Sequence, residues 1–411
     1  MTRSSRADYL GEVAELLWPA PLRWELSRRP SRANGAVVQE FVVIPSARTP
    51  RMLVPTRPRL AAAALRNSQS GSGSRERLRA LALATAFRLH LGRVVFRDRL
   101  RVWSPDGRRP TPDTSLKAHL DAVTGTDGSW ALPVTRARAN RKPVLQVLDP
   151  RARPVAFVKV GTNALTRALV RAEERSLDSV QGCLATTAVP GVIASTDWGE
   201  LSLLALSPLP LARRSASAPP ERVTVAALEI MRVGGSRVLP LRDADYWTRL
   251  RERIAGLEDA RGAMLLSAWQ RLDELAGLVE VEIGAWHGDW APWNMAWVDG
   301  ELLVWDFERF ERGVPVGFDL VHADLQTRIL DPSRSAEALI LDRLEHAPAL
   351  LRAAGVSTTT SYVVFTAYLL EIGCRWLGDR QGEAGGWNTE LDDIIRCADT
   401  AAVRAGNRHA Q

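Results

Sequence analysis

The stretch Ala285–Glu308 constrains the fold more than any other part of the chain, because its centre has the pattern of a β-hairpin. Met295–Val298 and Glu301–Trp305 are apolar runs of β-favouring residues. They are separated by Asp299-Gly300, the kind of dipeptide that best tolerates the two positive φ angles of a two-residue turn. The sequence therefore predicts two antiparallel strands joined by a tight turn.

The register of this hairpin decides which polar side chains meet at its open end. If Val298 pairs with Glu301, Asn294 lies opposite Trp305 and Asp306 is the next residue along the chain. Side chains alternate between the two faces of a regular strand, so Asn294 and Asp306 share a ligand only where both lie just beyond the strands. We therefore expect irregular backbone at both residues if they bind one ligand.

The polar groups near this end suit phosphate and metal chemistry. Asp306 supplies carboxylate oxygens and Asn294 an amide oxygen, which are hard ligands suited to a Mg²⁺ ion that keeps part of its water. Asp289 precedes Asn294 in a polar turn and is a candidate to take a proton from an attacking hydroxyl group. Glu308, close after Asp306, is a further acidic candidate for holding the metal or a water.

The order of these residues resembles the catalytic core of the aminoglycoside phosphotransferase and choline kinase families, which have a protein-kinase-like fold. The resemblance spans residues 115–380 and rests on four elements in order: His287-x-Asp289-x-x-x-x-Asn294, Asp306-x-Glu308, Gly313-x-Pro315 and Asp319-Leu320. An HxD motif alone is common, but the ordered set across a hairpin is far more specific.

The resemblance implies ATP as the phosphate donor and Mg²⁺ as the metal. It also implies a role for each matched residue: Asp289 as the catalytic base, Asn294 and Asp306 as Mg²⁺ ligands, His287 as a loop-positioning residue, and Asp319 as a structural acceptor that holds the catalytic loop.

Lys159 lies inside the apolar run Val155–Val160, where an unpaired ammonium group would be costly to bury. It therefore needs an anionic partner, and the predicted helix that follows offers Glu173 and Glu174. The spacing of Glu173 from the apolar positions of that helix favours it, and the resemblance implies that the pair aims Lys159 at the α- and β-phosphates.

Two further segments are candidates for nucleotide binding. The loop that follows the strand-like run Ser129–Val134 is rich in arginine and has no glycine, so Arg138, Arg141 and Lys142 are candidates to contact phosphates in place of backbone amides. An exposed basic turn is the competing interpretation. At the end of the apolar run 199–206, Leu206 marks a proline-rich hinge, where members of the family bind adenine.

Composition limits the class of protein. The chain has 411 residues, 46% of them apolar and 25% charged, which is the balance of a globular protein of two or three domains. No segment reaches the roughly eighteen apolar residues of a membrane span, and no apolar run of secretory length lies near the start. The three cysteines lack metal-site spacing. We expect a cytoplasmic protein with no membrane partner.

The net charge of +7 raises nucleic-acid binding as an alternative, because basic patches neutralise phosphates. The arginines are spread along the chain without a dense run, so nucleic acid is not the partner that we expect. Only three of the 54 basic residues are lysines, and two of them, Lys142 and Lys159, fall in the segments discussed above.

These observations together predict a bilobal α+β fold. We expect a small, mostly β nucleotide-binding lobe at 113–206, a helical catalytic lobe at 207–411, and an additional α/β region at 1–112 that includes a strand over Arg93–Trp103. The expected function is ATP- and Mg²⁺-dependent transfer of the γ-phosphate to a hydroxyl of a small molecule of the aminoglycoside, sugar or amino-alcohol type. Trp290 is the aromatic residue best placed in sequence to contact that acceptor. The alternative is a catalytically silent kinase-like scaffold that binds a partner through its amino-terminal region.

Overall fold

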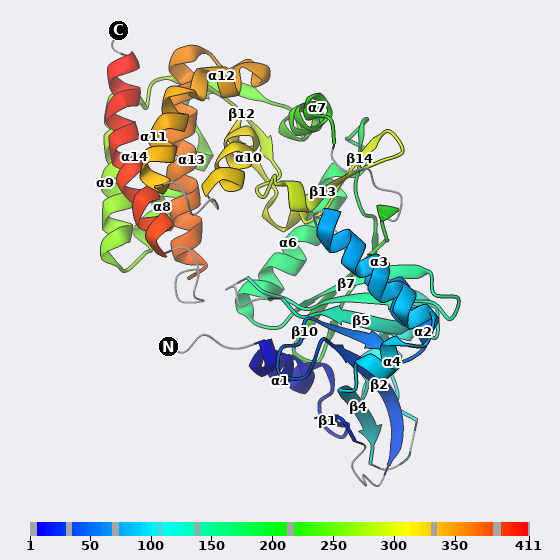
Figure 1. Cartoon of the computed structure of the whole chain (residues 1–411). Coiled ribbons are helices and arrows are strands. Elements are labelled where there is room, and N and C mark those ends of the chain that lie inside the picture. Colours follow the sequence, from blue (N-terminus) through cyan, green and yellow to red (C-terminus); the bar gives the residue numbers. More distant parts are fainter. Residues whose placement is uncertain are drawn as a thin grey trace. The chain divides into compact units, whose positions relative to one another are not determined.

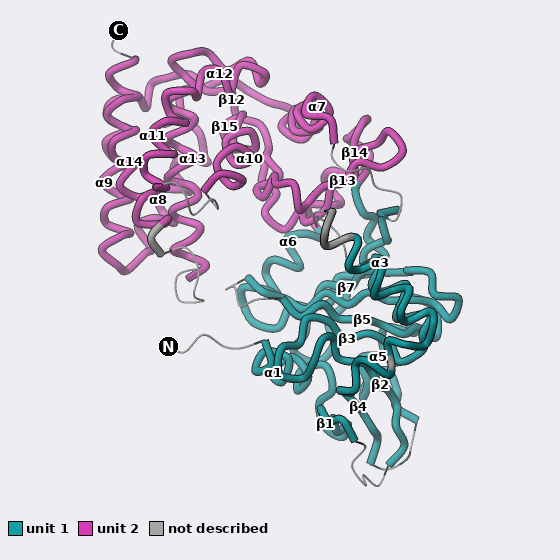
Figure 2. Tube along the Cα trace, viewed as in Figure 1, with its two compact units in different colours: residues 1–174, 189–216 teal, residues 175–188, 217–411 magenta. Residues whose placement is uncertain are grey.

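The computed structural model describes residues 6–29, 35–67, 74–105, 107, 109–135, 140–211, 218–329, 335–380 and 388–409. The chain divides into two compact units, shown in different colours in Figure 2. Unit 1 comprises residues 1–174 and 189–216, and unit 2 comprises residues 175–188 and 217–411. The expected boundary after residue 112 therefore lies inside unit 1.

Unit 1 is built on one nine-stranded sheet in which every neighbouring pair of strands is antiparallel. In spatial order the strands are β1 (Arg23–Ser27), β4 (Arg99–Ser104), β2 (Ala36–Ile44), β3 (Met52–Pro55), β5 (Ser129–Pro133), β6 (Val144–Leu148), β7 (Pro154–Gly161), β10 (Leu201–Leu206) and β9 (Val192–Trp198). The first four strands come from the amino-terminal region, so this region extends the sheet that contains Lys159.

The two faces of this sheet carry separate hydrophobic cores, as the alternation of strand side chains requires. Val43 and Leu53 belong to one core, which is closed by α1 (Arg6–Leu17) and α5 (Leu116–Thr124). Their neighbours Val42 and Val54 belong to the other, closed by α2 (Pro58–Asn67) and α3 (Ser74–Arg88). Figure 1 shows α1, α2 and α3 beside the strands.

The strand expected over Arg93–Trp103 is only half correct. Strand β4 begins at Arg99, and the preceding residues form the short helix α4 (Gly92–Val95), in which the amides of Val94 and Val95 donate to the carbonyl of Leu91. The apolar, β-branched residues before Arg99 favoured a strand in isolation, but this turn of helix follows directly on α3.

Unit 2 is mostly helical. Its helices are α7 (Pro220–Met231), α8 (Asp245–Ala255), α9 (Ala260–Ala276), α10 (Phe318–Ile329), α11 (Ala336–Glu345), α12 (Ala347–Leu351), α13 (Thr358–Gly378) and α14 (Asn388–His409). Helix α13 is buried around its whole circumference from Ser361 to Cys374, as expected of a central helix, and α14 packs against both α9 and α13. A unit with helices packed around one large antiparallel sheet and a mostly helical unit confirm the predicted α+β class.

Two small sheets complete unit 2. One has the order β11 (Arg237–Pro240), β12 (Glu280–Trp286), β15 (Glu311–Pro315), and the other has β13 (Met295–Val298), β14 (Glu301–Val304), β8 (Thr187–Ala188). Within the described residues, no helix combines the length and apolar character needed to span a bilayer.

The hairpin of β13 and β14 forms as predicted. Val298 pairs with Glu301 and Met295 with Val304, which is the expected register. The turn residues Asp299 and Gly300 have φ angles of 50° and 93°. The Asp-Gly signal was therefore sufficient to locate both strands and their pairing.

Candidate active site

At the open end of the hairpin, Asn294 and Asp306 have the irregular backbone that they need if both are to bind one ligand. The amide of Trp305 donates to the carbonyl of Asn294 at 3.1 Å, which confirms that these residues face each other. Asn294 ends a short 3-10 helix, and Asp306 adopts the left-handed region with φ 72°. Both residues thus lie outside regular strand. A non-glycine residue at positive φ is strained, and such strain is concentrated at functional sites.

The loop after β12 is held by a buried carboxylate. Asp319, in the first turn of α10, accepts hydrogen bonds from the backbone amides of His287 (2.7 Å) and Gly288 (3.2 Å). Burial raises the pKa of Asp319 to about 7, against the lowering effect of these two hydrogen bonds. Gly288 has φ 84°, and a Cβ added there would collide with the carbonyl oxygen of Arg309, so only glycine fits.

His287 connects this loop to the hairpin. The amide of Asp289 lies 3.2 Å from Nδ1 of His287, and the carbonyl oxygen of Trp305 lies 3.1 Å from Nε2. The amide can only donate, so Nδ1 is the unprotonated acceptor and Nε2 carries the hydrogen. Burial lowers the pKa of His287 to about 4, which matches this neutral form. His287 therefore ties Asp289 to the residue that precedes Asp306.

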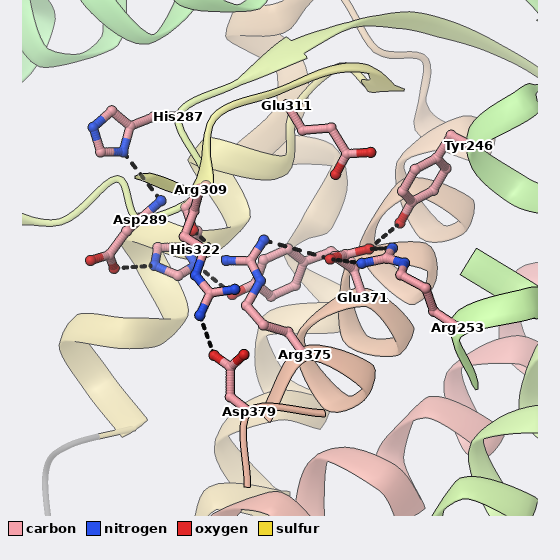
Figure 3. A network of polar contacts seen from close by, with 12 residues as sticks. Tyr246, Arg253, His287, Asp289, Arg309, Glu311, His322, Glu371, Arg375 and Asp379 are labelled. Carbon is pink, nitrogen blue, oxygen red and sulfur yellow. Dashed lines mark hydrogen bonds and ion pairs between the residues drawn. The ribbon is translucent and has the colours of Figure 1, made fainter. Parts of the chain in front are cut away.

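Both carboxylate oxygens of Asp289 are engaged by side chains. Asn294 Nδ2 donates to Oδ2 at 2.8 Å and to the backbone carbonyl of Asp289 at 2.9 Å. His322 Nε2 lies 3.2 Å from Oδ1, as Figure 3 shows. The carboxylate is nevertheless 35% exposed, so it is held in one orientation and stays accessible.

The protonation states around Asp289 follow from these contacts. Burial and the nearby charge of Asp306 push the pKa of Asp289 upward, but the hydrogen bond from His322 holds it below the ordinary value. An ionised Asp289 can only accept, so His322 Nε2 carries the hydrogen. Nδ1 of His322 then accepts from the hydroxyl of Tyr368 at 3.0 Å. Burial lowers the pKa of His322, which favours this neutral form.

Sequence reasoning missed the residues that support Asp289 from α10 and α13. His322 and Asp319 are three residues apart on α10, and this helical spacing is a signal that could have identified His322. Tyr368 and Arg375 come from α13, far along the chain. Arg375 donates to the carbonyl of Gly288 at 2.6 Å and lies over the ring of Trp286.

Arg375 is itself part of a buried network, shown in Figure 3. It pairs with Glu371 at 3.5 Å, and Glu371 also pairs with Arg253 and accepts from the hydroxyl of Tyr246 at 3.1 Å. This network joins α13 to α8. It thereby holds Arg375 in the position from which it contacts the loop at Gly288. Trp290 is 1% exposed and packs against His287, so it is not placed to stack on an acceptor.

In unit 1, Lys159 has the anionic partner that its position requires. Ala156, Val158 and Val160 of β7 belong to the core on one face of the sheet, so Lys159 projects from the other face. Its Nζ lies 2.6 Å from Oε1 of Glu173 on α6 (Ala164–Val180), and Glu173 is completely buried.

The two acidic residues of this helix have different partners. Glu174 accepts from the hydroxyl of Ser195 at 2.7 Å, whereas Glu173 pairs with Lys159. The structure therefore decides between the two alternatives in favour of Glu173. The role of the pair in nucleotide binding stays a prediction.

The other candidate nucleotide contacts are placed differently. Arg141 lies over the ring of Tyr9 and donates to the carbonyl of Thr135, and burial lowers its pKa to about 10. These contacts compete with a phosphate for Arg141. Lys142 is partly exposed, Leu206 is buried at the end of β10, and Arg138 lies outside the described residues. Their roles in nucleotide binding stay predictions.

The residues of unit 2 fit a divalent cation chemically. Both amide hydrogens of Asn294 are directed at Asp289, so its amide oxygen is the atom available to a metal. Asp306 adds a carboxylate whose negative charge is felt by both Asp289 and His287. The carboxylate of Asp306 and the amide oxygen of Asn294 are hard ligands of the kind that bind Mg²⁺. Glu308 is buried in the following 3-10 helix, and its role stays a prediction.

Comparison with known proteins finds similarity only at the level of structure. No protein-family model and no curated protein matches the sequence. A thermostable mutant of an aminoglycoside phosphotransferase in complex with ADP and hygromycin B is 15% identical, with a TM-score of 0.42, covering 72% of this chain and 99% of that one.

Two further structures are similar to a comparable degree. The streptomycin–ATP complex of another aminoglycoside phosphotransferase is 11% identical, with a TM-score of 0.41 and coverage of 72% and 97%. A choline kinase from Streptococcus pneumoniae is 12% identical, with a TM-score of 0.39 and coverage of 64% and 89%. Similarity this distant assigns neither a family nor an activity to this chain, so the function must be argued from the site.

Proposed function

We propose that this chain is an ATP- and Mg²⁺-dependent phosphotransferase that moves the γ-phosphate to a hydroxyl group of a small molecule. The observation that supports this most is the state of Asp289. Its carboxylate is accessible, ionised, fixed at both oxygens by Asn294 and His322, and close to a second carboxylate at Asp306.

Asp289 would orient the acceptor hydroxyl and take its proton during transfer. General-base catalysis of this kind contributes about 10²–10⁴-fold in rate. The low pKa of Asp289 makes it a weak base, which suits phosphoryl transfer, because little proton removal is needed before the phosphoryl group departs from ATP. The main task of Asp289 is then to hold the hydroxyl in line with the phosphorus.

Asn294 and Asp306 would hold Mg²⁺, which when bound supplies positive charge to the phosphates. Asn294 would have two tasks, because its amide nitrogen orients Asp289 and its oxygen would be available to bind the metal. Lys159, directed by Glu173, would contact the phosphates of ATP. His322 would act through Asp289, by fixing the rotation of the carboxylate.

The proposal is tested by incubating the purified chain with ATP, Mg²⁺ and a library of aminoglycosides, sugars and amino alcohols. We expect ADP release that depends on one class of acceptor, together with an acceptor heavier by one phosphoryl group in mass spectrometry. Chelation of Mg²⁺ should abolish both signals, and added Mg²⁺ should restore them. Nucleotide binding without transfer to any hydroxyl compound would favour the catalytically silent scaffold instead.

A further inference from the structure

Helix α3 carries apolar side chains on its outer face as well as on its inner face. Ala80, Ala84 and Phe87 are at most 4% exposed, on the side of the helix that packs against α2. At 100° per residue, Leu78 and Leu81 lie on the opposite side of the helix, and they are 67% and 52% exposed. The apolar character of the outer face therefore contributes nothing to the core of unit 1.

The apolar surface continues beyond the end of α3. The amide of Leu89 still donates to the carbonyl of Thr85, so its side chain follows the helical spacing and is 64% exposed. Leu91, Val94 and Val95 on and beside α4 are 54%, 65% and 67% exposed. We call the six side chains Leu78, Leu81, Leu89, Leu91, Val94 and Val95 the α3–α4 face. Six exposed aliphatic side chains within residues 78–95 are more than the singly scattered apolar residues that are normal on a surface.

Arginines outnumber acidic residues around the α3–α4 face, with Glu76 in α3 and Asp98 after α4 as the acidic neighbours in the chain. Residues 77–97 contain no acidic residue but include Arg77, Arg79, Arg88, Arg93 and Arg97, and the adjacent helix α2 has no acidic residue either. Arg79 and Arg88 are exposed and lie on opposite flanks of the apolar stripe. Burial is the main cause that lowers the pKa of Arg66 on α2, and the charge of Arg88 lowers this pKa further. The positive charges of Arg66 and Arg88 are therefore close together.

We propose that the α3–α4 face docks on the surface of an anionic lipid bilayer. The exposed leucines of α3 can enter the acyl region of a bilayer while the arginines that flank them contact lipid phosphates. The proposal concerns surface docking of unit 1 and is independent of the proposed phosphotransferase activity. It departs from the sequence-based expectation that a membrane is not a partner.

The chemistry of the face favours lipid over two other occupants. A symmetric contact with a second copy would place each set of arginines near its own equivalent, and like charges repel. A specific protein partner is usually bound through aromatic anchors and hydrogen-bonding groups, whereas the six side chains of this face are all leucine or valine. A fluid acyl layer needs neither aromatic anchors nor hydrogen-bonding groups.

The test is co-sedimentation of the full chain with vesicles of phosphatidylcholine alone and of phosphatidylcholine mixed with an anionic phospholipid. We expect binding to the mixed vesicles only, weakened by added salt. Leu78→Gln/Leu81→Gln/Leu89→Gln should lower the partition coefficient about tenfold or more. Arg79→Gln/Arg88→Gln should lower it about fivefold for each arginine removed.

A matched control uses exposed apolar residues outside this face. Met264 and Leu278 are 49% and 66% exposed, and Met264→Gln/Leu278→Gln should bind vesicles as the wild type does. Circular dichroism melting checks that each variant is folded. Equal binding by the leucine variant overturns the proposal, as does the absence of vesicle binding by the wild type. A wild-type dimer that becomes monomeric in the leucine variant, without vesicle binding, would identify the face as a contact between copies.

Discussion

His322 Nε2 lies 3.2 Å from Asp289 Oδ1, although the two residues are 33 positions apart in the chain. Tyr368, from a third segment, contacts the other nitrogen of the same ring. This arrangement gives Asp289 a neutral donor on one oxygen, while Asn294 supplies the donor on the other. The orientation of the proposed base is therefore set by tertiary structure as well as by its own loop.

Replacing His322 should impair transfer more than substrate binding. His322→Ala removes the donor to Asp289 and should lower kcat about 10–100-fold with a small change in the KM for ATP, because the carboxylate loses its fixed rotation. His322→Gln retains a side-chain N–H and should recover part of the activity. Steady-state kinetics of both variants provide the measurement. Wild-type kcat in His322→Ala would show that this contact has only a structural role.

The buried neutral His287 should make stability fall in mild acid. Its pKa is about 4 in the folded chain and about 6.5 when unfolded. The unfolded state therefore binds a proton first, and stability present above pH 6.5 is lost as the pH falls towards 4, by up to about 3 kcal/mol.

The control for this prediction is His287→Gln, which retains Asp319. The pKa of Asp319 is raised to about 7, so its contribution to stability changes in the opposite direction and cancels in the comparison. Denaturant unfolding at several pH values should show the stability advantage of the wild type over the variant shrinking as the pH falls from 6.5 to 4. An advantage that is independent of pH would contradict the assigned state of His287.

Gly288→Ala should destabilise the chain more than Gly300→Ala. Both glycines have positive φ, but only Gly288 has a backbone neighbour, the carbonyl of Arg309, where a Cβ would lie. Gly300→Ala should cost about 1 kcal/mol from backbone strain alone. Gly288→Ala should cost several kcal/mol more or displace the loop, with a loss of activity. Equal free energies of unfolding of the two variants would contradict this prediction, because they would show that the contact between the new Cβ and Arg309 has no cost in stability.

Variants of the Lys159–Glu173 pair can distinguish its contribution to stability from its contribution to nucleotide binding. Lys159→Met leaves a buried carboxylate without its ammonium partner and should destabilise by about 3–5 kcal/mol. The double variant Lys159→Met/Glu173→Gln should regain most of that stability. Both variants should bind ATP weakly, as measured by titration calorimetry. Wild-type affinity for ATP in the stable double variant would remove Lys159 from the nucleotide site.

The sequence could predict what depends on short-range pattern. The Asp-Gly turn fixed the hairpin, its register placed Asn294 opposite Trp305, and the buried position of Lys159 required an acidic partner. It could not predict Tyr368 or Arg375 as partners of the loop, because helix α13 is separated from it by tens of residues and no local period records which face packs there. For His322 the one available signal was its helical spacing from Asp319.

The amino-terminal region shows a second limit of prediction from sequence, which concerns the pairing of strands. Its strands are four of the nine strands of the antiparallel sheet. Nothing in residues 1–112 indicates which later strand they join, and β3 pairs with β5 through only two residue pairs. The half-incorrect strand over Arg93–Trp103 arose because Val94 and Val95 favour strand in isolation. Their exposure on α4 is explained if they contact something other than the core of unit 1.

The measurement that tests the central claim most directly is single-turnover transfer from ATP by Asp289→Asn, beside its affinity for ATP with Mg²⁺. Asparagine retains the size of the side chain but removes the base and its charge. We predict near-normal nucleotide affinity with transfer reduced at least about 100-fold. Transfer at the wild-type rate in this variant would show that Asp289 is not the base.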